Sequence, residues 1–187
     1  MTRSSERTRQ RILEAAYELF YRDGFARVGV DTIAAEAGVT KRALYYHYPS
    51  KDALLAAVLD FQHGFALRHI QDWAADASND PVQLVEHLFD GLALWAADPK
   101  WKGSGFTRLT MELAGLPGHP ARAAASTHKA AVEAWLADVL AQGGVADAKE
   151  TARQIMLLSE GCLSLILIHG DTSYARTAAA VAKRLVR

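Results

Sequence analysis

The chain has 187 residues, half of them hydrophobic, and its 21 basic and 21 acidic side chains leave no formal net charge. A neutral chain is not expected to coat nucleic acid by charge alone. Its length is enough for a small head and a larger body, each with a core. Residues 1–51 hold nine Lys or Arg and six Asp or Glu, so this end carries a modest positive excess.

Cysteine usage and hydropathy predict a cytoplasmic protein with no membrane partner. Cys162 is the single cysteine, which excludes a disulfide within the chain and fits a reducing compartment. The N-terminus is polar and charged, unlike a signal peptide. The longest apolar stretch, residues 155–168, is interrupted by Glu160 and is too short to span a bilayer, so we expect a buried helix there.

The first three predicted helices are closely spaced, and the second and third are short. Residues 5–22 place apolar side chains on one helical face, at Ile12, Ala15, Ala16, Leu19 and Phe20, and Gly24 ends this helix. A second helix covers about 30–37 and is followed by a turn at Gly38. Thr40 is the expected N-cap of a third helix, which runs to about Tyr48 and is stopped by Pro49.

The rest of the chain predicts further helices. Ser50 caps a long fourth helix, and Asp80-Pro81 opens another that ends near Pro99. Helices follow at about 106–113, 121–142, 147–170 and 173–185. Asp147 and Glu150 resemble a capping box, and Thr172 or Ser173 caps the last helix. Because no useful strand-like alternation occurs, the predicted fold class is all-α.

The spacing of three residues predicts a helix-turn-helix. Counted from Val30, a small Ala34 is fifth, Gly38 is ninth and Leu44 is fifteenth. Ala34 lets the two helices approach, Gly38 can take the positive φ that the turn needs, and Leu44 with Ile33 fills the corner. Such a unit presents its second helix to the DNA major groove.

The run GVTKRALYYHYPSKDALL after this spacing resembles the tetracycline-repressor (TetR) family of transcriptional regulators, over about residues 8–60. The resemblance implies a dimer with a DNA-binding helix-turn-helix domain at 1–50. It further implies a helical ligand-binding and dimerisation domain at 51–187. A small ligand in that domain is expected to release the protein, a repressor, from a palindromic double-stranded operator.

The recognition helix is short, so few side chains can reach bases. Lys41 or Arg42 can donate two hydrogen bonds to guanine, and Ala43 can touch a thymine methyl group. The resemblance implies that Tyr45 and His47 bind phosphate or sugar and that Lys51 neutralises a phosphate. The predicted DNA-binding residues are therefore Thr40, Lys41, Arg42, Ala43, Tyr45, Tyr46, His47 and Lys51.

Several side chains near this helix have a second interpretation. Tyr46 either contacts DNA or packs against neighbouring helices, whereas we expect Tyr48 to pack. The arginines at the start, Arg3, Arg7, Arg9 and Arg11, form either a DNA-binding arm or ordinary solvated charges. The dipole of the second helix favours an acid at its first turn, where Asp31 lies, and the same carboxylate can also repel phosphate.

Two further sets of residues are expected in the body. An apolar or aromatic ligand cavity is assigned to Phe65, Trp73, Phe89, Trp95, Phe106, Met111, Glu112, Trp135, Met156 and His169, although each can instead fill the core or pair at the surface. The dimer interface is assigned to Leu158, Cys162, Leu165 and Ile166 with Ala179, Ala182 and Leu185. Part of this surface must also pack in the core of the chain itself.

Two other classes of function are weighed against a DNA-binding regulator. An enzyme is not expected, because the sequence has no evident nucleophile–His–acid set and no glycine-rich phosphate loop. No metal and no cofactor are expected either, since His63 and His69 are six residues apart and His119 and His128 nine apart. A helical scaffold that uses the helix-turn-helix for protein contact is the remaining alternative.

Overall fold

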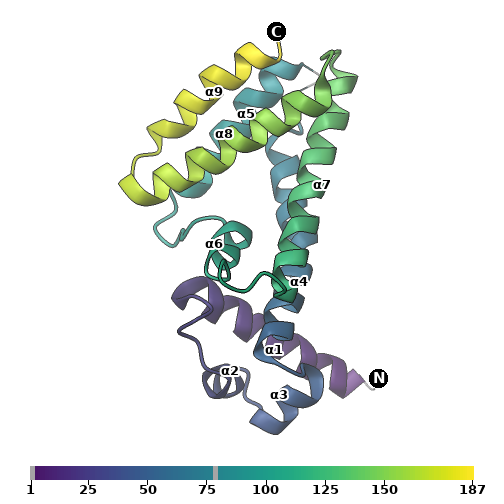
Figure 1. Ribbon diagram of the computed structural model, residues 1–187, viewed down its shortest axis with the longest axis vertical. Helices are drawn as coiled ribbons and strands as arrows, with labels where there is room; N and C mark the ends of the chain where they lie inside the picture. The colour runs from purple at the N-terminus through teal and green to yellow at the C-terminus, as the bar shows by residue number, and fades with distance from the viewer. Residues whose placement is uncertain (1–2, 78–79) are drawn as a thin grey trace. The chain divides into compact units, whose positions relative to one another are not determined.

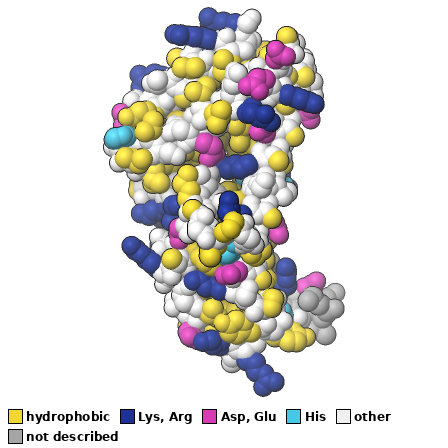
Figure 2. Space-filling model, viewed as in Figure 1, with side chains coloured by type: hydrophobic (Ala, Val, Ile, Leu, Met, Phe, Trp, Pro, Cys, Tyr) yellow, Lys and Arg dark blue, Asp and Glu magenta, His cyan; other side chains and the backbone are white. Residues whose placement is uncertain are grey.

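The computed structural model of the chain describes residues 3–77 and 80–187, and within them the fold is all-α, with nine helices and no strand (Figure 1). The predicted fold class is confirmed. The residues form two compact units, one of residues 1–64 with 105–128 and the other of residues 65–104 with 129–187. Positive and negative side chains are interspersed on the face in Figure 2.

The first unit is built around α1 (Arg3–Asp23), which contacts α2 (Val30–Glu36), α3 (Lys41–His47) and α6 (Gly105–Met111). It also holds the first parts of α4 (Lys51–Trp73) and α7 (Pro120–Gln142). The predicted apolar face of α1 is buried, and Ile33 and Leu44 are fully buried where α2 meets α3. The predicted plug of the helix-turn-helix corner is therefore present.

The second unit has α5 (Pro81–Ala96), α8 (Ala148–His169) and α9 (Ser173–Leu185) packed against one another, together with the remaining parts of α4 and α7. Gly91 of α5 lies against the Trp73 indole so closely that a Cβ there would stand 2.3 Å from the Trp73 Cγ atom. Only a residue without a side chain lets that ring lie on α5.

Three of the predicted helix caps are confirmed. Thr40 Oγ1 accepts a hydrogen bond from the Ala43 N–H at 3.1 Å, and Ser50 Oγ accepts one from the Ala53 N–H at 3.0 Å. The Asp80 carboxylate accepts from the Val82 N–H at 2.8 Å at the start of α5. Each satisfies a first-turn N–H that has no partner within its own helix.

Asp147 and Thr172 occupy the predicted N-cap positions of the last two helices, but neither side chain makes a cap hydrogen bond. Glu150 accepts from the Gln154 amide at 3.2 Å instead of reaching back. Asp171 caps the start of α9 instead, because its carboxylate accepts a hydrogen bond from the Ser173 N–H at 2.8 Å.

Helix α8 is longer than the apolar stretch within it. By length and composition the whole of α8, which extends beyond residues 155–168, is the one helix of the described residues that is long and apolar enough to cross a membrane. A core helix of a soluble protein passes the same test, and α8 packs on α5 and α9. Only one of its faces is buried: Leu157 and Ile168 are about 70% exposed (69% and 71%).

Candidate nucleic-acid interface

The recognition helix, α3, presents its first turn to solvent. The Thr40 cap fixes where the helix begins, and Leu44 anchors its opposite face in the core. Lys41 and Arg42 are exposed and Ala43 is half-buried. Two cations and a methyl group therefore stand at the end of the helix that enters a groove in helix-turn-helix proteins.

The turn before α3 is held by Arg11 of α1. Gly38 has a φ of +61°, in the left-handed region that the spacing predicted. The Arg11 guanidinium donates hydrogen bonds to the Ala37 carbonyl and, at 3.1 Å, to the Gly38 carbonyl. Arg11, which was considered for a DNA-binding arm, thus braces the helix-turn-helix instead.

The other arginines of the possible arm differ among themselves. Arg9 lies over the Tyr48 ring, 5.4 Å from its centroid, and Arg7 is exposed. The side chain of Arg3 lies outside the described residues. Tyr48 is buried and its hydroxyl donates to the Arg9 carbonyl at 3.4 Å, which confirms that it packs. Burial raises the pKa of the Tyr48 phenol.

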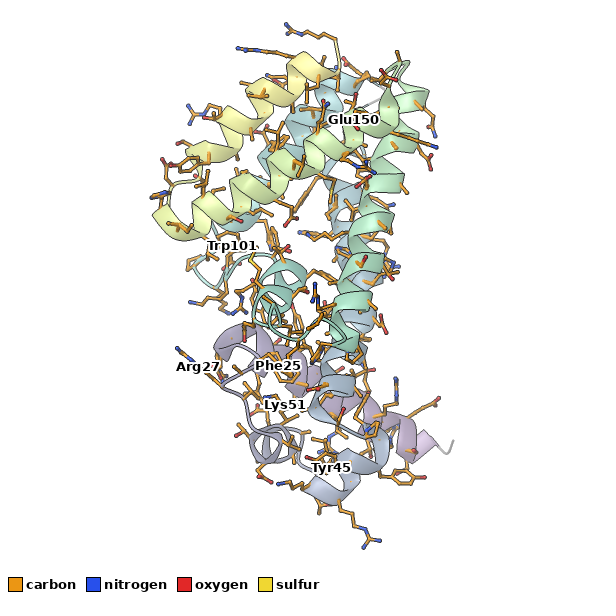
Figure 3. All side chains as sticks on the ribbon, viewed as in Figure 1. Phe25, Arg27, Tyr45, Lys51, Trp101 and Glu150 are labelled. Atoms are coloured by element: carbon orange, nitrogen blue, oxygen red, sulfur yellow. The ribbon has the colours of Figure 1, made fainter. Side chains whose placement is uncertain are left out.

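The remaining aromatic residues of α3 divide between surface and interior. Tyr46 is 81% exposed, so its packing interpretation is wrong, and Tyr45 is exposed as well (Figure 3). His47 is half-buried, its ring meets Tyr46 edge-on at 5.2 Å, and its Nδ1 atom is buried without a hydrogen-bond partner among the described residues. The two tyrosines thus offer hydroxyl groups to a ligand of α3.

Lys41 is tied to the neighbouring helix. Its Nζ atom lies 3.0 Å from Oδ2 of Asp31, in the first turn of α2. This hydrogen bond and the opposite charge raise the pKa of the Lys41 ammonium above its ordinary value. Both side chains remain largely exposed, so solvent screens the pair and it adds little to the stability of the fold.

Lys51 opens α4 and lies over the Phe25 ring, with Nζ 4.2 Å from the ring centroid (Figure 3). Partial burial lowers the pKa of Lys51, while the charges of Asp52 and Glu112 act in the opposite direction. The lysine is therefore not a freely solvated charge. A cation held over an aromatic face keeps a fixed position beside the helix-turn-helix.

Among the residues predicted to line a ligand cavity, three lie in the first unit and do not surround a described cavity. Phe106 is buried and stacks on His128, with centroids 3.7 Å apart, whereas Met111 is exposed. Glu112 accepts the Ala26 N–H at 3.1 Å, so its carboxylate secures the loop between α1 and α2. That role accounts for an acidic side chain at the end of α6.

The other seven residues lie in the second unit. Trp73 and Trp95 come together at 6.2 Å between centroids, and Trp101, which was not in the predicted set, lies 5.9 Å from Trp95. The Nε1 atom of Trp101 is buried without a hydrogen-bond partner among the described residues. Of the remainder, Phe89 is buried in the core, Trp135 and Met156 are half-buried, and Phe65 and His169 are exposed.

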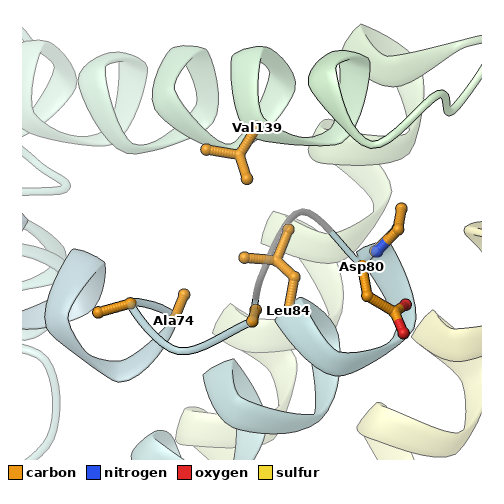
Figure 4. Close-up of a pocket in the computed structure, with 7 residues that line it drawn as sticks. Ala74, Asp80, Leu84 and Val139 are labelled. Atoms are coloured by element: carbon orange, nitrogen blue, oxygen red, sulfur yellow. The ribbon is translucent and has the colours of Figure 1, made fainter.

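A small pocket of about 120 Å³ in the second unit is lined by none of the predicted ligand residues (Figure 4). Its lining is Ala74, Ala75, Ala77, Asp80, Pro81, Leu84 and Val139. Drug-sized ligands need about 300–1,000 Å³, and the Asp80 carboxylate is already engaged as the cap of α5. This pocket is therefore a poor ligand site.

Comparison with known proteins identifies the helix-turn-helix. Residues 12–58 match the family described as bacterial regulatory proteins, tetR family. The HTH-type transcriptional repressor SCO4008 of Streptomyces coelicolor is 31% identical over 162 residues, which cover 83% of this chain and 77% of that protein. The chain belongs to the TetR family.

Solved structures of the TetR family share the whole fold. The TetR-family regulator SCO4454 of Streptomyces coelicolor superposes with a TM-score of 0.83 at 25% identity, covering 97% of this chain and 95% of that one. Other curated relatives match over much less: SrpR of Pseudomonas putida is 40% identical over 79 residues, 42% of this chain and 37% of that protein. The match to YerO of Bacillus subtilis covers 27% of that relative. The relatives are named as transcriptional regulators, and this chain spans well under half of the length of SrpR and YerO.

The dimer interface assigned to this TetR-family chain needs correction. Cys162 and Ile166 of α8 and Ala179 and Ala182 of α9 are buried in the core of their own chain, so they cannot contact a second copy directly. Leu158 and Leu185 are half-buried against the same core, and Leu165 is exposed. In α8 apolar residues lie on both faces, so their pattern alone does not tell the inward face from the outward one. In α9 the predicted small residues are the ones that pack on the core of their own chain.

Sequence reasoning also missed a histidine pair. Nδ1 of His63 on α4 lies 3.2 Å from Nδ1 of His128 on α7, with the two rings edge to face. The two residues are 65 positions apart, and no local spacing pairs them. Among the described residues no group of three or more His, Cys, Asp or Glu is placed to hold a metal ion.

Proposed function

We propose that the chain is a homodimeric repressor that binds a palindromic double-stranded operator and leaves it when a small apolar or aromatic ligand enters its body. Residues 1–50 act as the DNA-binding domain, and residues 51–187 provide ligand binding and dimerisation. The observation that carries the proposal is the capped first turn of α3, which holds exposed Lys41 and Arg42 beside exposed Tyr45 and Tyr46. The protein acts in the cytoplasm, where its operator is.

At the operator, Arg42 donates to a guanine edge and Ala43 touches a thymine methyl group. Thr40, Tyr45, Tyr46 and His47 bond to the sugar-phosphate backbone, since hydroxyl and imidazole groups are its usual uncharged partners. Lys51, fixed over the Phe25 ring, neutralises one phosphate at the start of α4. Lys41, which donates a hydrogen bond to Asp31, is the second cation of this first turn.

The dimer forms through the outward faces of α8 and α9. Leu157, Gly161, Leu165 and Ile168 are exposed and follow a helical stripe along α8, and Val181 is exposed on α9. Exposed leucine and isoleucine in one stripe favour association, and Gly161 lets a second helix approach closely. Two copies of α8 and α9 then form a four-helix interface, and two heads read the two halves of a palindrome.

The ligand is expected to meet the aromatic side chains of the second unit. Trp73, Trp95 and Trp101 form a row of ring contacts, and the buried indole N–H of Trp101 is available to an acceptor on a ligand. Trp135 and Met156 add half-buried apolar surface. Such a lining suits a flat, weakly polar molecule with at least one oxygen or nitrogen acceptor.

The repressor role is supported by SCO4008, which is named a transcriptional repressor. The experiment is selection of duplexes from a randomised library, followed by footprinting on the selected sequence. We expect a protected palindrome, bound by two copies, whose protection is lost when an aromatic ligand is added. A protein that enriches no sequence and binds no duplex at low salt contradicts the proposal.

A further inference from the structure

The two cations in the first turn of α3 are held differently. Arg42 makes no ion pair and no hydrogen bond with the described residues, whereas Lys41 donates to Asp31 at 3.0 Å. The bond joins the first turn of α3 to the first turn of α2, ten residues earlier. One base-reading cation is thus free and its neighbour is restrained by a carboxylate.

Asp31 does not have to face Lys41 in order to stabilise α2. The helix dipole favours an acid in the first turn whichever way its side chain points. The N-cap of α2 is Gly29, which provides no side-chain cap. The first helix of a helix-turn-helix crosses the phosphate backbone, so a carboxylate at its start stands where phosphates approach. An acid there that pairs with Lys41 withholds this cation from the phosphates of DNA of any sequence.

We propose that Asp31 is a specificity-determining residue, which keeps the Lys41 ammonium from binding phosphates indiscriminately and so makes binding depend on base contacts. This inference rests on the proposed role of α3 at the operator. Asp31 touches Lys41 and acts through it, so it is a positioning residue for the lysine.

The two kinds of DNA respond differently to loss of Asp31. On a random duplex, attraction to phosphates supplies nearly all of the binding, so a released Lys41 adds one full ion contact. On the operator, Arg42 already engages bases and Asp31 keeps the lysine aligned beside it. Releasing Lys41 there adds a phosphate contact but loses that alignment, so the gain is smaller.

The test is Asp31→Asn, which keeps the shape of the side chain and removes its charge. Binding is measured over a salt series on a random duplex and on a duplex that the unmodified protein selects from a randomised library. On the random duplex we expect roughly fivefold to tenfold tighter binding and a salt slope steeper by about one unit. The ratio of selected to random affinity is expected to fall by about threefold or more.

Three variants make the result specific. Asp23→Asn removes another exposed acid, one that pairs with Arg22 and lies outside the helix-turn-helix, and it should leave the ratio unchanged. In a Lys41→Gln background, Asp31→Asn should have little effect, because Asp31 acts through the lysine. Asp31→Ser repeats the loss of charge with another side chain, and circular dichroism shows that each variant is folded.

Two outcomes overturn the inference while the proposed function stands. An unchanged ratio in Asp31→Asn means that the acid does not govern specificity. An effect that persists in Lys41→Gln means that Asp31 acts by general repulsion and not through Lys41. If the unmodified protein selects no duplex, the proposed function fails first and this inference fails with it.

Discussion

Gly38 lies so close to Arg11 that a Cβ at position 38 would stand 2.5 Å from the Nη2 atom of the guanidinium. The contact joins α1 to the turn between α2 and α3, where Arg11 bonds the Ala37 and Gly38 carbonyls. The backbone at Gly38 is also left-handed. The turn therefore depends on glycine for its conformation, and a side chain there would also push the Arg11 guanidinium away from these carbonyls.

Gly38→Ala is expected to destabilise the protein by about 1–2 kcal/mol, from the left-handed backbone together with displacement of Arg11. Thermal unfolding followed by circular dichroism measures the loss. Gly64→Ala is the matched control, because nothing lies within 4 Å of a Cβ at this position inside α4. There alanine should be neutral or stabilising by up to about 1 kcal/mol. Equal effects at the two positions refute this account of the turn.

Arg42→Ala is expected to change which base is preferred at one position of each half-site, at a cost of about 1–3 kcal/mol for the original base. Repeating the duplex selection with the variant measures the change. Lys51→Ala provides the contrast, since loss of a phosphate contact weakens all sequences alike and reduces the salt slope by about one unit. If Arg42→Ala selects the same sequence as the unmodified protein, Arg42 does not read a base.

Leu157→Glu is expected to convert the dimer to monomers with little loss of protomer stability, because the side chain is exposed on α8. Light scattering after size-exclusion chromatography gives the mass. Leu94→Glu makes the same change at a side chain of α5 that is 76% exposed and outside the proposed interface. That variant should remain dimeric. A dimeric Leu157→Glu variant places the interface elsewhere.

The Cys162 thiol is expected to be unreactive in the folded protein, since burial raises its pKa to about 11. Reaction with a disulfide reagent at pH 8 should be slow until denaturant is added. The pKa of the thiol is near 9 in the unfolded chain and about 11 in the folded one. Its contribution to stability is therefore complete below about pH 9 and is lost as the pH rises from about 9 to 11. The stability difference between the unmodified protein and Cys162→Ala should therefore narrow by about 2–3 kcal/mol over that range. Rapid labelling of the native protein at pH 8 contradicts the assignment.

What could be predicted from sequence was local. The positions of Ala34, Gly38 and Leu44 determine a turn of a few residues, and the caps at Thr40, Ser50 and Asp80 act within three residues of themselves. Because these contacts join residues that are close in sequence, few other local structures compete with them. The same local spacing supported the family resemblance that the comparisons confirm.

What could not be predicted depends on which way a helix faces. Helix α8 is apolar on both sides, with Ile155, Cys162 and Ile166 inward and Leu157 and Ile168 outward, so periodicity could not separate core from surface. The histidine pair and the contact between Trp73 and Trp95 depend on how separate helices pack. Those contacts need the arrangement of the helices in space.

Titration of the unmodified protein onto its selected duplex, with the stoichiometry and the salt dependence both recorded, tests the central claim most directly. We predict two protomers bound per palindrome, with affinity that falls steeply as salt rises and exceeds that for a random duplex by about a thousandfold or more. One protomer per site, or equal affinity for both duplexes at every salt concentration, contradicts the account.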